Sequence, residues 1–221
     1  MSSDDIRYCI DNQEKIYEVL DKITEILPPE TAEKIDELLF EYNIEEIYNI
    51  INSIFPDFSN ETGITLSSLK LLYLLSSSLQ LKNKLFSNEE YIDILKNLVD
   101  IYGERLSDLL EINSSTFNIS NLNPLLSLGN PKYLEIYKSI LEKKLMSVHN
   151  MDAVIEVLKE CDSSAIDKEL IINFLDNYNV SATGPSIEDF FKSLSNSILQ
   201  DGDIAKNLIG KLNTIDSCTG I

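Results

Sequence analysis

His149 and Cys161 are the residues best suited to nucleophilic chemistry, because the chain has a single histidine and a cysteine follows twelve positions later. A cysteine nucleophile needs a histidine within hydrogen-bond reach and a third group that orients the imidazole. A predicted helix separates the two residues, and no orienting partner is evident in the sequence. We therefore expect His149 to lie at a helix boundary as a cap, and we expect no enzymatic activity.

Acidic residues suggest a second kind of chemistry, but each acidic group has a structural explanation. The Asp-Gly-Asp run at 201–203 resembles the start of a calcium loop, yet the later glycine and the terminal glutamate of such a loop are missing. The pairs Glu45-Glu46 and Glu89-Glu90 fall in predicted first helical turns, where negative charge complements the helix dipole. An enzyme whose site is assembled from scattered carboxylates and tyrosines remains one alternative.

The sequence contains no recognisable ligand set for a metal or a cofactor, and we expect neither. One histidine excludes the usual histidine-rich zinc and iron sites, and the seven scattered glycines form no phosphate-binding loop. Cys9, Cys161 and Cys218 form no C-x-x-C pair and are odd in number, which argues against a disulfide framework. The chain also begins without the basic and apolar regions of a secretory signal, so we expect a cytoplasmic protein.

The charge balance is strongly acidic, with 37 Asp and Glu against 18 Lys and Arg and a formal net charge of −19. Proteins that bind nucleic acid neutralise phosphates with clustered basic side chains, and this chain has no such cluster. We therefore expect neither nucleic acid nor an anionic membrane as a partner. The acidity indicates either a solvated surface or a basic protein partner attracted by the field. The oligomeric state does not follow from the sequence.

Residues 65–102 have the clearest pattern and predict two long helices packed against each other at the centre of the fold. Apolar residues cover most of the circumference of the first helix, which is typical of a buried helix. Leu72, Leu75, Leu95 and Leu98 are predicted to be fully buried where the two helices meet. Ser87 and Glu90 predict a capping box at the start of the second helix, and Gly103 follows its end.

The rest of the chain also has helical periodicity and no sustained alternation typical of strands. Helices are predicted over about 4–27, 30–42, 44–54, 131–145, 151–158, 166–178, 187–198 and 204–215. In the helix over 44–54, five isoleucines are predicted to point inward: Ile44, Ile47, Ile50, Ile51 and Ile54. The Ser- and Asn-rich segment 113–123 has no period and predicts a flexible loop.

The three-helix grouping around 130–179, and more loosely the pattern over 66–110, resembles armadillo and HEAT-type helical-repeat proteins. The resemblance implies an all-α fold, a right-handed α-solenoid of about ten to eleven helices. It favours one domain over 1–215, with a subdivision considered near 113–123, and a frayed tail at 216–221. Proteins of that kind are mostly scaffolds, adaptors and assembly chaperones that bind a protein partner in a helical groove.

The same resemblance suggests a partner-binding face. In armadillo repeats the third helix lines the groove, and its asparagines hold the backbone of an extended peptide, because one amide both donates and accepts a hydrogen bond. Asn173 and Asn177 lie four residues apart on the predicted third helix, hence on one face, and Asp176 beside them would suit a basic peptide. An ordinary solvated helix face would carry the same residue types.

The stretch Tyr102-Gly103-Glu104-Arg105 supports a third possibility. It is similar to the Gly-Arg element of Bcl-2-like helical bundles, although Glu104 separates the glycine from the arginine and the chain has no tryptophan for the second motif of that family. This resemblance implies a compact bundle that binds a partner helix.

Overall fold

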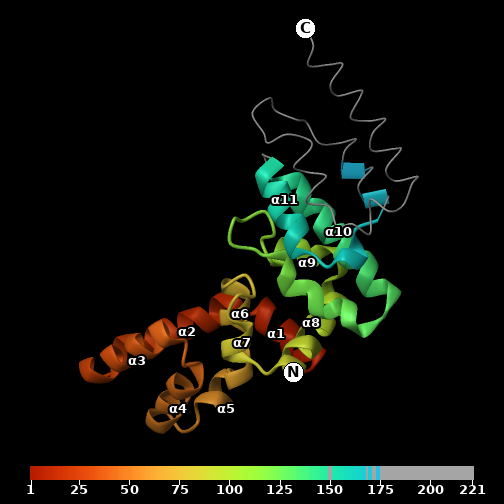
Figure 1. The fold of residues 1–221 in the computed structure, drawn as a ribbon. Coiled ribbons are helices and arrows are strands. Elements are labelled where there is room, and N and C mark those ends of the chain that lie inside the picture. Colours follow the sequence, from red (N-terminus) through yellow and green to blue (C-terminus); the bar gives the residue numbers. More distant parts are fainter. Residues whose placement is uncertain (149–150, 168, 171–172, 175–221) are drawn as a thin grey trace. The chain divides into compact units, whose positions relative to one another are not determined.

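The computed structural model describes residues 1–148, 151–167, 169–170 and 173–174 (Figure 1). Over these residues the regular secondary structure is helical and contains no strand, which confirms the all-α prediction. The chain divides into two compact units, one of residues 1–110 and a second that begins at Glu111. The single domain over 1–215 stays a prediction, and the helices predicted at 187–198 and 204–215 lie outside the described residues.

The first unit consists of nine α-helices and one 3₁₀ turn. In chain order they are α1 (Ser3–Asp11), α2 (Gln13–Ile26), α3 (Pro29–Glu41), α4 (Ile44–Ile54), α5 (Phe58–Thr62), α6 (Leu66–Ser76), α7 (Lys82–Leu85), α8 (Asn88–Tyr102), η1 (Gly103–Arg105) and α9 (Leu106–Leu109).

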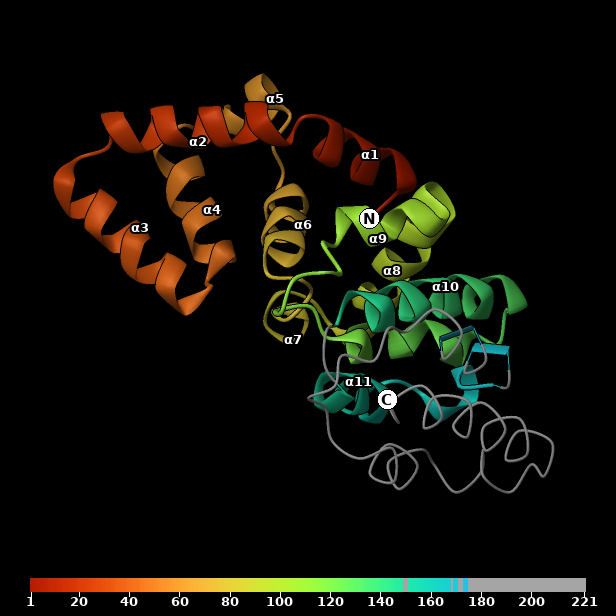
Figure 2. The ribbon, with the colours of Figure 1, turned by 90° about the horizontal axis from the view of Figure 1, so that it is seen from above.

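Helix α1 packs against both α6 and α8 (Figure 2). The α6 and α8 helices have few direct contacts with each other, so the predicted central pair is wrong in its pairing. Two fully buried side chains, Ile6 and Cys9, fill the contact made by α1. At its start, Ser3 Oγ donates to Asn97 Oδ1 at 3.1 Å, and Asn97 Nδ2 donates to the carbonyl of Met1 at 3.1 Å.

The predicted helix over 65–85 is interrupted after Ser76. Ser78 and Leu79 have positive φ angles of 52° and 68°. The Ser78 N–H donates to the Leu75 carbonyl at 3.1 Å and the Leu79 N–H to the Leu74 carbonyl at 3.0 Å. This pair of hydrogen bonds is the Schellman pattern that ends a helix. The termination has no glycine signal, because serine occupies the left-handed position where glycine is usual.

The core predictions are mostly confirmed. Leu72, Leu95 and Leu98 are fully buried, but Leu75 is only half-buried, so that part of the prediction is wrong. In the last turn of α6 the neighbouring Leu74 takes the buried position. The Ser87 capping box is confirmed: Glu90 N–H donates to Ser87 Oγ at 3.3 Å, and Ser87 N–H donates to the Glu90 carboxylate at 2.9 Å. Gly103 caps the end of α8, as predicted.

The long N-terminal helix predicted over 4–27 is two helices, α1 and α2, separated at Asn12. The backbone of Asn12 has φ −110° and ψ 16°, and its side-chain Nδ2 donates to the Tyr8 carbonyl at 2.8 Å. Asparagine side chains compete with helical hydrogen bonds in this way. The boundary predicted between the helices over 4–27 and 30–42 is confirmed, since α2 ends before Pro28 and α3 begins with Pro29.

Over the described residues, the second unit comprises a turn at 111–118, η2 (Ile119–Leu128), α10 (Pro131–Ser147), α11 (Met151–Glu160) and η3 (Ser163–Ala165). Helix α10 packs on η2, and α11 and η3 pack on α10. The loop predicted over 113–123 is therefore half wrong, because residues 119–123 belong to a 3₁₀ helix. A 3₁₀ helix has three residues per turn and carries no signal at the α-helical period.

Two polar side chains of α10 join these elements. Tyr137 is fully buried; its hydroxyl donates to Asn123 Oδ1 at 2.6 Å and accepts from the Asp162 N–H at 3.1 Å. Lys144 is buried, and its ammonium donates to the Ser114 carbonyl at 2.8 Å. Its Nζ also lies 5.8 Å from the centroid of the Phe117 ring. These contacts hold the 111–118 turn and η2 against α10.

Candidate functional site

Helices α2, α3 and α4 carry a dense set of acidic side chains. Residues 13–54 contain eleven Asp and Glu but only three Lys, and no Arg or His. All eleven carboxylate residues are exposed: Glu14, Glu18, Asp21, Glu25, Glu30, Glu33, Asp36, Glu37, Glu41, Glu45 and Glu46. We call the exposed residues of 13–54 the α2–α4 surface.

The same surface carries apolar side chains that the fold leaves uncovered. Phe40 on α3 is 87% exposed and Ile26 at the end of α2 is 67% exposed, the two highest values among the large hydrophobic residues that the structure describes. Tyr42 and Ile54 are 38% and 40% exposed. The inward position predicted for Ile54 is therefore wrong: it shares a face with Ile47 and Ile51 but is the last residue of α4. Ile50 is only half-buried.

The incomplete burial of helix α2 accounts for part of this exposure. Its apolar residues follow the helical period, but Ile16 is the one buried residue among its fourteen, and Val19, Leu20 and Ile23 are half-buried. Its main packing contact is with α1. Near its start, α2 borders a cavity of about 130 Å³ whose lining includes Ile16, Val19 and Ile64. The apolar stripe along the second half of α2 is therefore only partly covered by the rest of the protein.

Helix α3 has an outer face that combines an aromatic ring with carboxylates. Glu33, Asp36 and Glu37 precede Phe40 by seven, four and three residues, so the four side chains share one face of the helix. All four are exposed. Lys34 lies 3.5 Å from Glu37, an exposed pair of small energetic value. We call Glu33, Asp36, Glu37 and Phe40 the α3 outer face.

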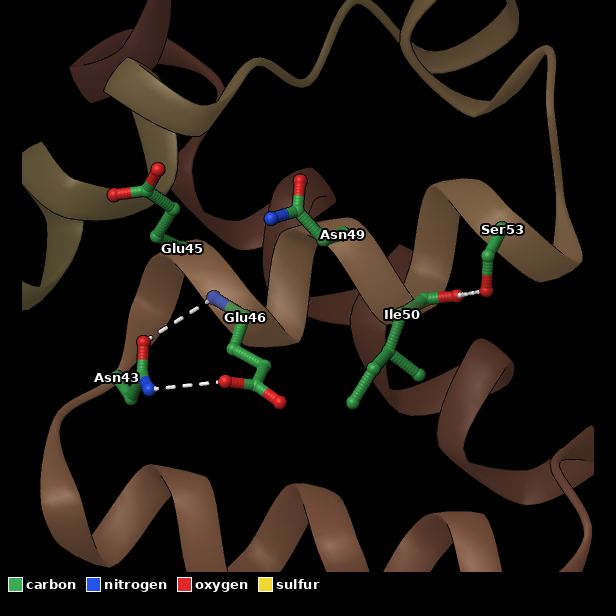
Figure 3. A pocket seen from close by; sticks show the side chains of 6 residues that line it. All are labelled: Asn43, Glu45, Glu46, Asn49, Ile50 and Ser53. Carbon is green, nitrogen blue, oxygen red and sulfur yellow. Dashed lines mark hydrogen bonds between the residues drawn. The ribbon is translucent and has the colours of Figure 1, made fainter.

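A shallow hollow of about 500 Å³ lies along α4 (Figure 3). Glu45 and Asn49 extend to one side of α4, and Glu46 and Ile50 extend to the other. The Asn43 side chain caps the helix, since its Oδ1 accepts from the Glu46 N–H at 3.3 Å. The hollow is lined by Asn43, Glu45, Glu46, Asn49, Ile50 and Ser53, so its chemistry is amide and carboxylate around one aliphatic side chain.

Tyr42 connects α3 to α4 in a conformation that tyrosine rarely adopts. Its φ is +59°, and it occupies the left-handed position of a Schellman motif: the Tyr42 N–H donates to the Leu39 carbonyl at 3.1 Å and the Asn43 N–H to the Leu38 carbonyl at 2.9 Å. Glycine would be less strained there. The ring lies beneath the ammonium of Lys84, with 4.7 Å between Nζ and the ring centroid.

Of the partner-binding face predicted from the sequence, one residue lies among the described residues. Asn173 is described and half-buried, whereas Asp176 and Asn177 lie outside the described residues. That face stays a prediction. The α2–α4 surface was not predicted as a site, although the sequence contained one signal for it. Phe40 lies outside the apolar stripe formed by Ile35 and Leu38 and is next to acidic positions.

The thiols of the described cysteines are poorly suited to nucleophilic chemistry. Cys161 is buried and its Sγ donates to the Leu158 carbonyl at 3.3 Å, and burial raises its pKa to about 12. Burial also raises the pKa of the Cys9 thiol to about 12. A thiolate is the reactive form, so neither residue is activated. His149 lies outside the described residues.

In the described part of the chain, no three or more His, Cys, Asp or Glu side chains cluster in a way that could hold a metal ion. Nor do the described residues include a helix with the length and apolarity that crossing a membrane requires.

No family model, curated protein or solved structure matches this chain. Among the described residues, the α2–α4 surface stands out: eleven exposed carboxylates and the two most exposed large apolar side chains of the described chain occur within 42 consecutive residues.

Proposed function

We propose that this protein is a non-enzymatic interaction protein, a scaffold, adaptor or assembly chaperone that binds a protein partner through a helical groove. The observation that supports this proposal is that exposed Ile26 and Phe40 lie on the α2–α4 surface among eleven exposed carboxylate residues and only three lysines. Aromatic side chains are enriched in the cores of protein–protein interfaces, and the rims of such interfaces are polar.

The energetics of Phe40 favour a binding role over a structural one. A fully buried phenylalanine contributes about 1.5–3 kcal/mol relative to an exposed one. At 87% exposure Phe40 contributes little of this to folding, so the same amount is available when a partner covers the ring. The surrounding carboxylates would accelerate encounter with a basic partner and disfavour an acidic one.

The proposal is tested by affinity capture from a native cell extract with three baits: the unaltered chain, Phe40→Gln and Leu128→Gln. Leu128 is a matched control because it is 39% exposed and lies in η2, away from the α2–α4 surface in sequence and in the second unit. We expect a protein that the unaltered chain and Leu128→Gln both retain and that Phe40→Gln loses. Equal recovery on all three baits would rule out the α2–α4 surface as the binding site.

We also propose that the helices stack as an armadillo- or HEAT-like solenoid, in which each helical hairpin leaves an apolar face for its neighbour. The unbroken succession of helices in the first unit supports this arrangement, whereas the packing of α1 against α6 and α8 joins helices that are not neighbours in the chain. Small-angle X-ray scattering checks it, because an elongated solenoid of this length has a larger radius of gyration than a compact globule. A radius of gyration equal to that of a compact globule would favour the Bcl-2-like bundle instead.

The face formed by Asn173, Asp176 and Asn177 is a second proposed contact with the partner. The test is the double substitution Asn173→Ala with Asn177→Ala, on a protein shown by circular dichroism to remain folded. We expect weaker binding of the captured partner. Unchanged affinity would remove this face from the proposal and leave the α2–α4 surface.

A further inference from the structure

We infer that the α3 outer face binds a basic amphipathic helix of the partner, with Phe40 seated in that helix's apolar stripe and its Lys or Arg side chains opposite Glu33, Asp36 and Glu37. This inference rests on the proposed function and names the chemistry of the partner. It also makes Phe40 the residue on which affinity depends.

The spacing on α3 favours a helical partner. The carboxylates precede Phe40 at intervals of three, four and seven residues and so form one row of about two helical turns along α3. An amphipathic helix presents its own side chains in rows of the same repeat, with apolar residues in one stripe and charged residues along its edges. One apolar contact at Phe40 and two or three ion pairs along the row can then form together.

Charge selects the kind of occupant. A second copy of this chain carries the same formal net charge of −19, so pairing two acidic surfaces would be opposed by repulsion. Residues 175–221 of the chain itself contain six Asp and Glu against three Lys, so they are also acidic. A partner helix rich in Lys or Arg is the occupant whose charge complements Glu33, Asp36 and Glu37.

A second aromatic side chain lies next to Phe40 at this end of α3. Tyr42 is 38% exposed. Phe40 and Tyr42 place two aromatic rings within three consecutive residues at the end of the acidic row.

The experiment uses the full-length chain and a synthetic amphipathic peptide of lysine and leucine, about four helical turns long to match α3. Two control peptides accompany it: a scrambled sequence of the same composition, and an amphipathic peptide with glutamate in place of lysine. Affinities are measured by fluorescence anisotropy at low and at physiological ionic strength. We expect the lysine peptide to bind most tightly, and its affinity to fall with salt.

Matched variants then locate the site. Phe40→Gln is expected to weaken the lysine peptide by about tenfold, as for an aromatic anchor, while Leu128→Gln stays within about twofold of the unaltered chain. Neutralising Glu33, Asp36 and Glu37 together should reduce the salt dependence. Neutralising three exposed carboxylates elsewhere, Glu89, Asp93 and Glu135, should change it much less. Circular dichroism confirms that each variant is folded.

Three results would overturn the inference: equal binding of the scrambled peptide, equal loss in both neutralised variants, or unchanged peptide affinity in Phe40→Gln. Self-association that sedimentation velocity detects and that Phe40→Gln abolishes would identify a second copy as the occupant and overturn it also. If Phe40→Gln loses the captured native partner but keeps the peptide, the proposed function stands and this inference fails. If the variant keeps both, the α2–α4 surface is not the binding site and this inference fails with it.

Discussion

The thiol of Cys9 donates a hydrogen bond to the backbone carbonyl of Ser68 at 3.3 Å and joins α1 to α6. Cys9 is fully buried, and Ser68 lies in the first turn of α6, where the capping box with Thr65 fixes the start of that helix. Through this contact the first helix of the chain is anchored against a helix that begins sixty residues later. The folding of the first unit therefore requires a contact between segments distant in the sequence.

Burial predicts that Cys9 and Cys161 are protected from thiol reagents in the folded protein. Their pKa values are raised to about 12, and both side chains are inaccessible. In a Cys218→Ser background, reaction with a chromogenic disulfide at about pH 8, near the ordinary thiol pKa, should be slow in buffer. It should become fast for both thiols in denaturant. Fast reaction of either thiol in buffer would contradict the burial described for it.

Core truncations should separate Leu72 and Leu95 from Leu75. Either Leu72→Ala or Leu95→Ala should reduce the free energy of unfolding by about 2–5 kcal/mol, because each removes fully buried methyl groups. Leu75→Ala is the matched control, and its cost should be clearly smaller since that side chain is half-buried. Urea denaturation gives all three values. A loss at Leu75 equal to that at Leu72 would contradict the half-buried position of Leu75.

The same substitution should have opposite effects at two exposed glutamates. Glu111 has a φ of +46°, so Glu111→Gly stabilises the folded state by removing a left-handed strain of about 1–2 kcal/mol. The glycine also stabilises the unfolded chain entropically, which costs about 0.5–1 kcal/mol. The free energy of unfolding should therefore rise by about 0.5–1 kcal/mol. Glu135 lies within α10, where glycine should cost about 1 kcal/mol. Thermal unfolding of both variants, which lose the same charge, measures the difference. Destabilisation by Glu111→Gly would contradict the strained turn.

Stability should fall at alkaline pH, partly through Tyr137. Burial raises the pKa of Tyr137 above its ordinary value, against the opposing hydrogen bond from the Asp162 N–H. The folded state thus keeps a proton that the unfolded state loses, and stability present below about pH 10 decreases as the pH rises further.

Tyr137→Phe tests this dependence. At neutral pH the variant should be less stable by about 1–3 kcal/mol, because Asn123 Oδ1 and the Asp162 N–H lose their shared partner. Its free energy of unfolding should also fall less steeply above about pH 10. Some slope should remain, since burial raises the pKa of Tyr91 as well. An unchanged slope would mean that Tyr137 ionises equally in both states.

Local features of this fold could be predicted from the sequence because local chemistry determines them. The Ser87 capping box, the Pro28-Pro29 boundary and the start of α10 at Pro131 each depend on residues within one helical turn. The 3.6-residue apolar period likewise indicated an all-α chain, since it reflects which face of each helix is buried. None of these features requires knowledge of what a helix packs against.

Pairing and exposure were decided only by the tertiary structure. A period shows that Leu72 and Leu98 are inward, but not that α1 lies between their helices, because burial in the core can be supplied by any apolar partner. The sequence pattern did not predict the helix endings at Asn12 and Ser78, because no proline or glycine marks them. These two residues adopt their conformations through hydrogen bonds to nearby carbonyls. Phe40 remains exposed because no other helix of the first unit covers the outer side of α3. This exposure is set by the packing of the helices and not by the sequence of α3.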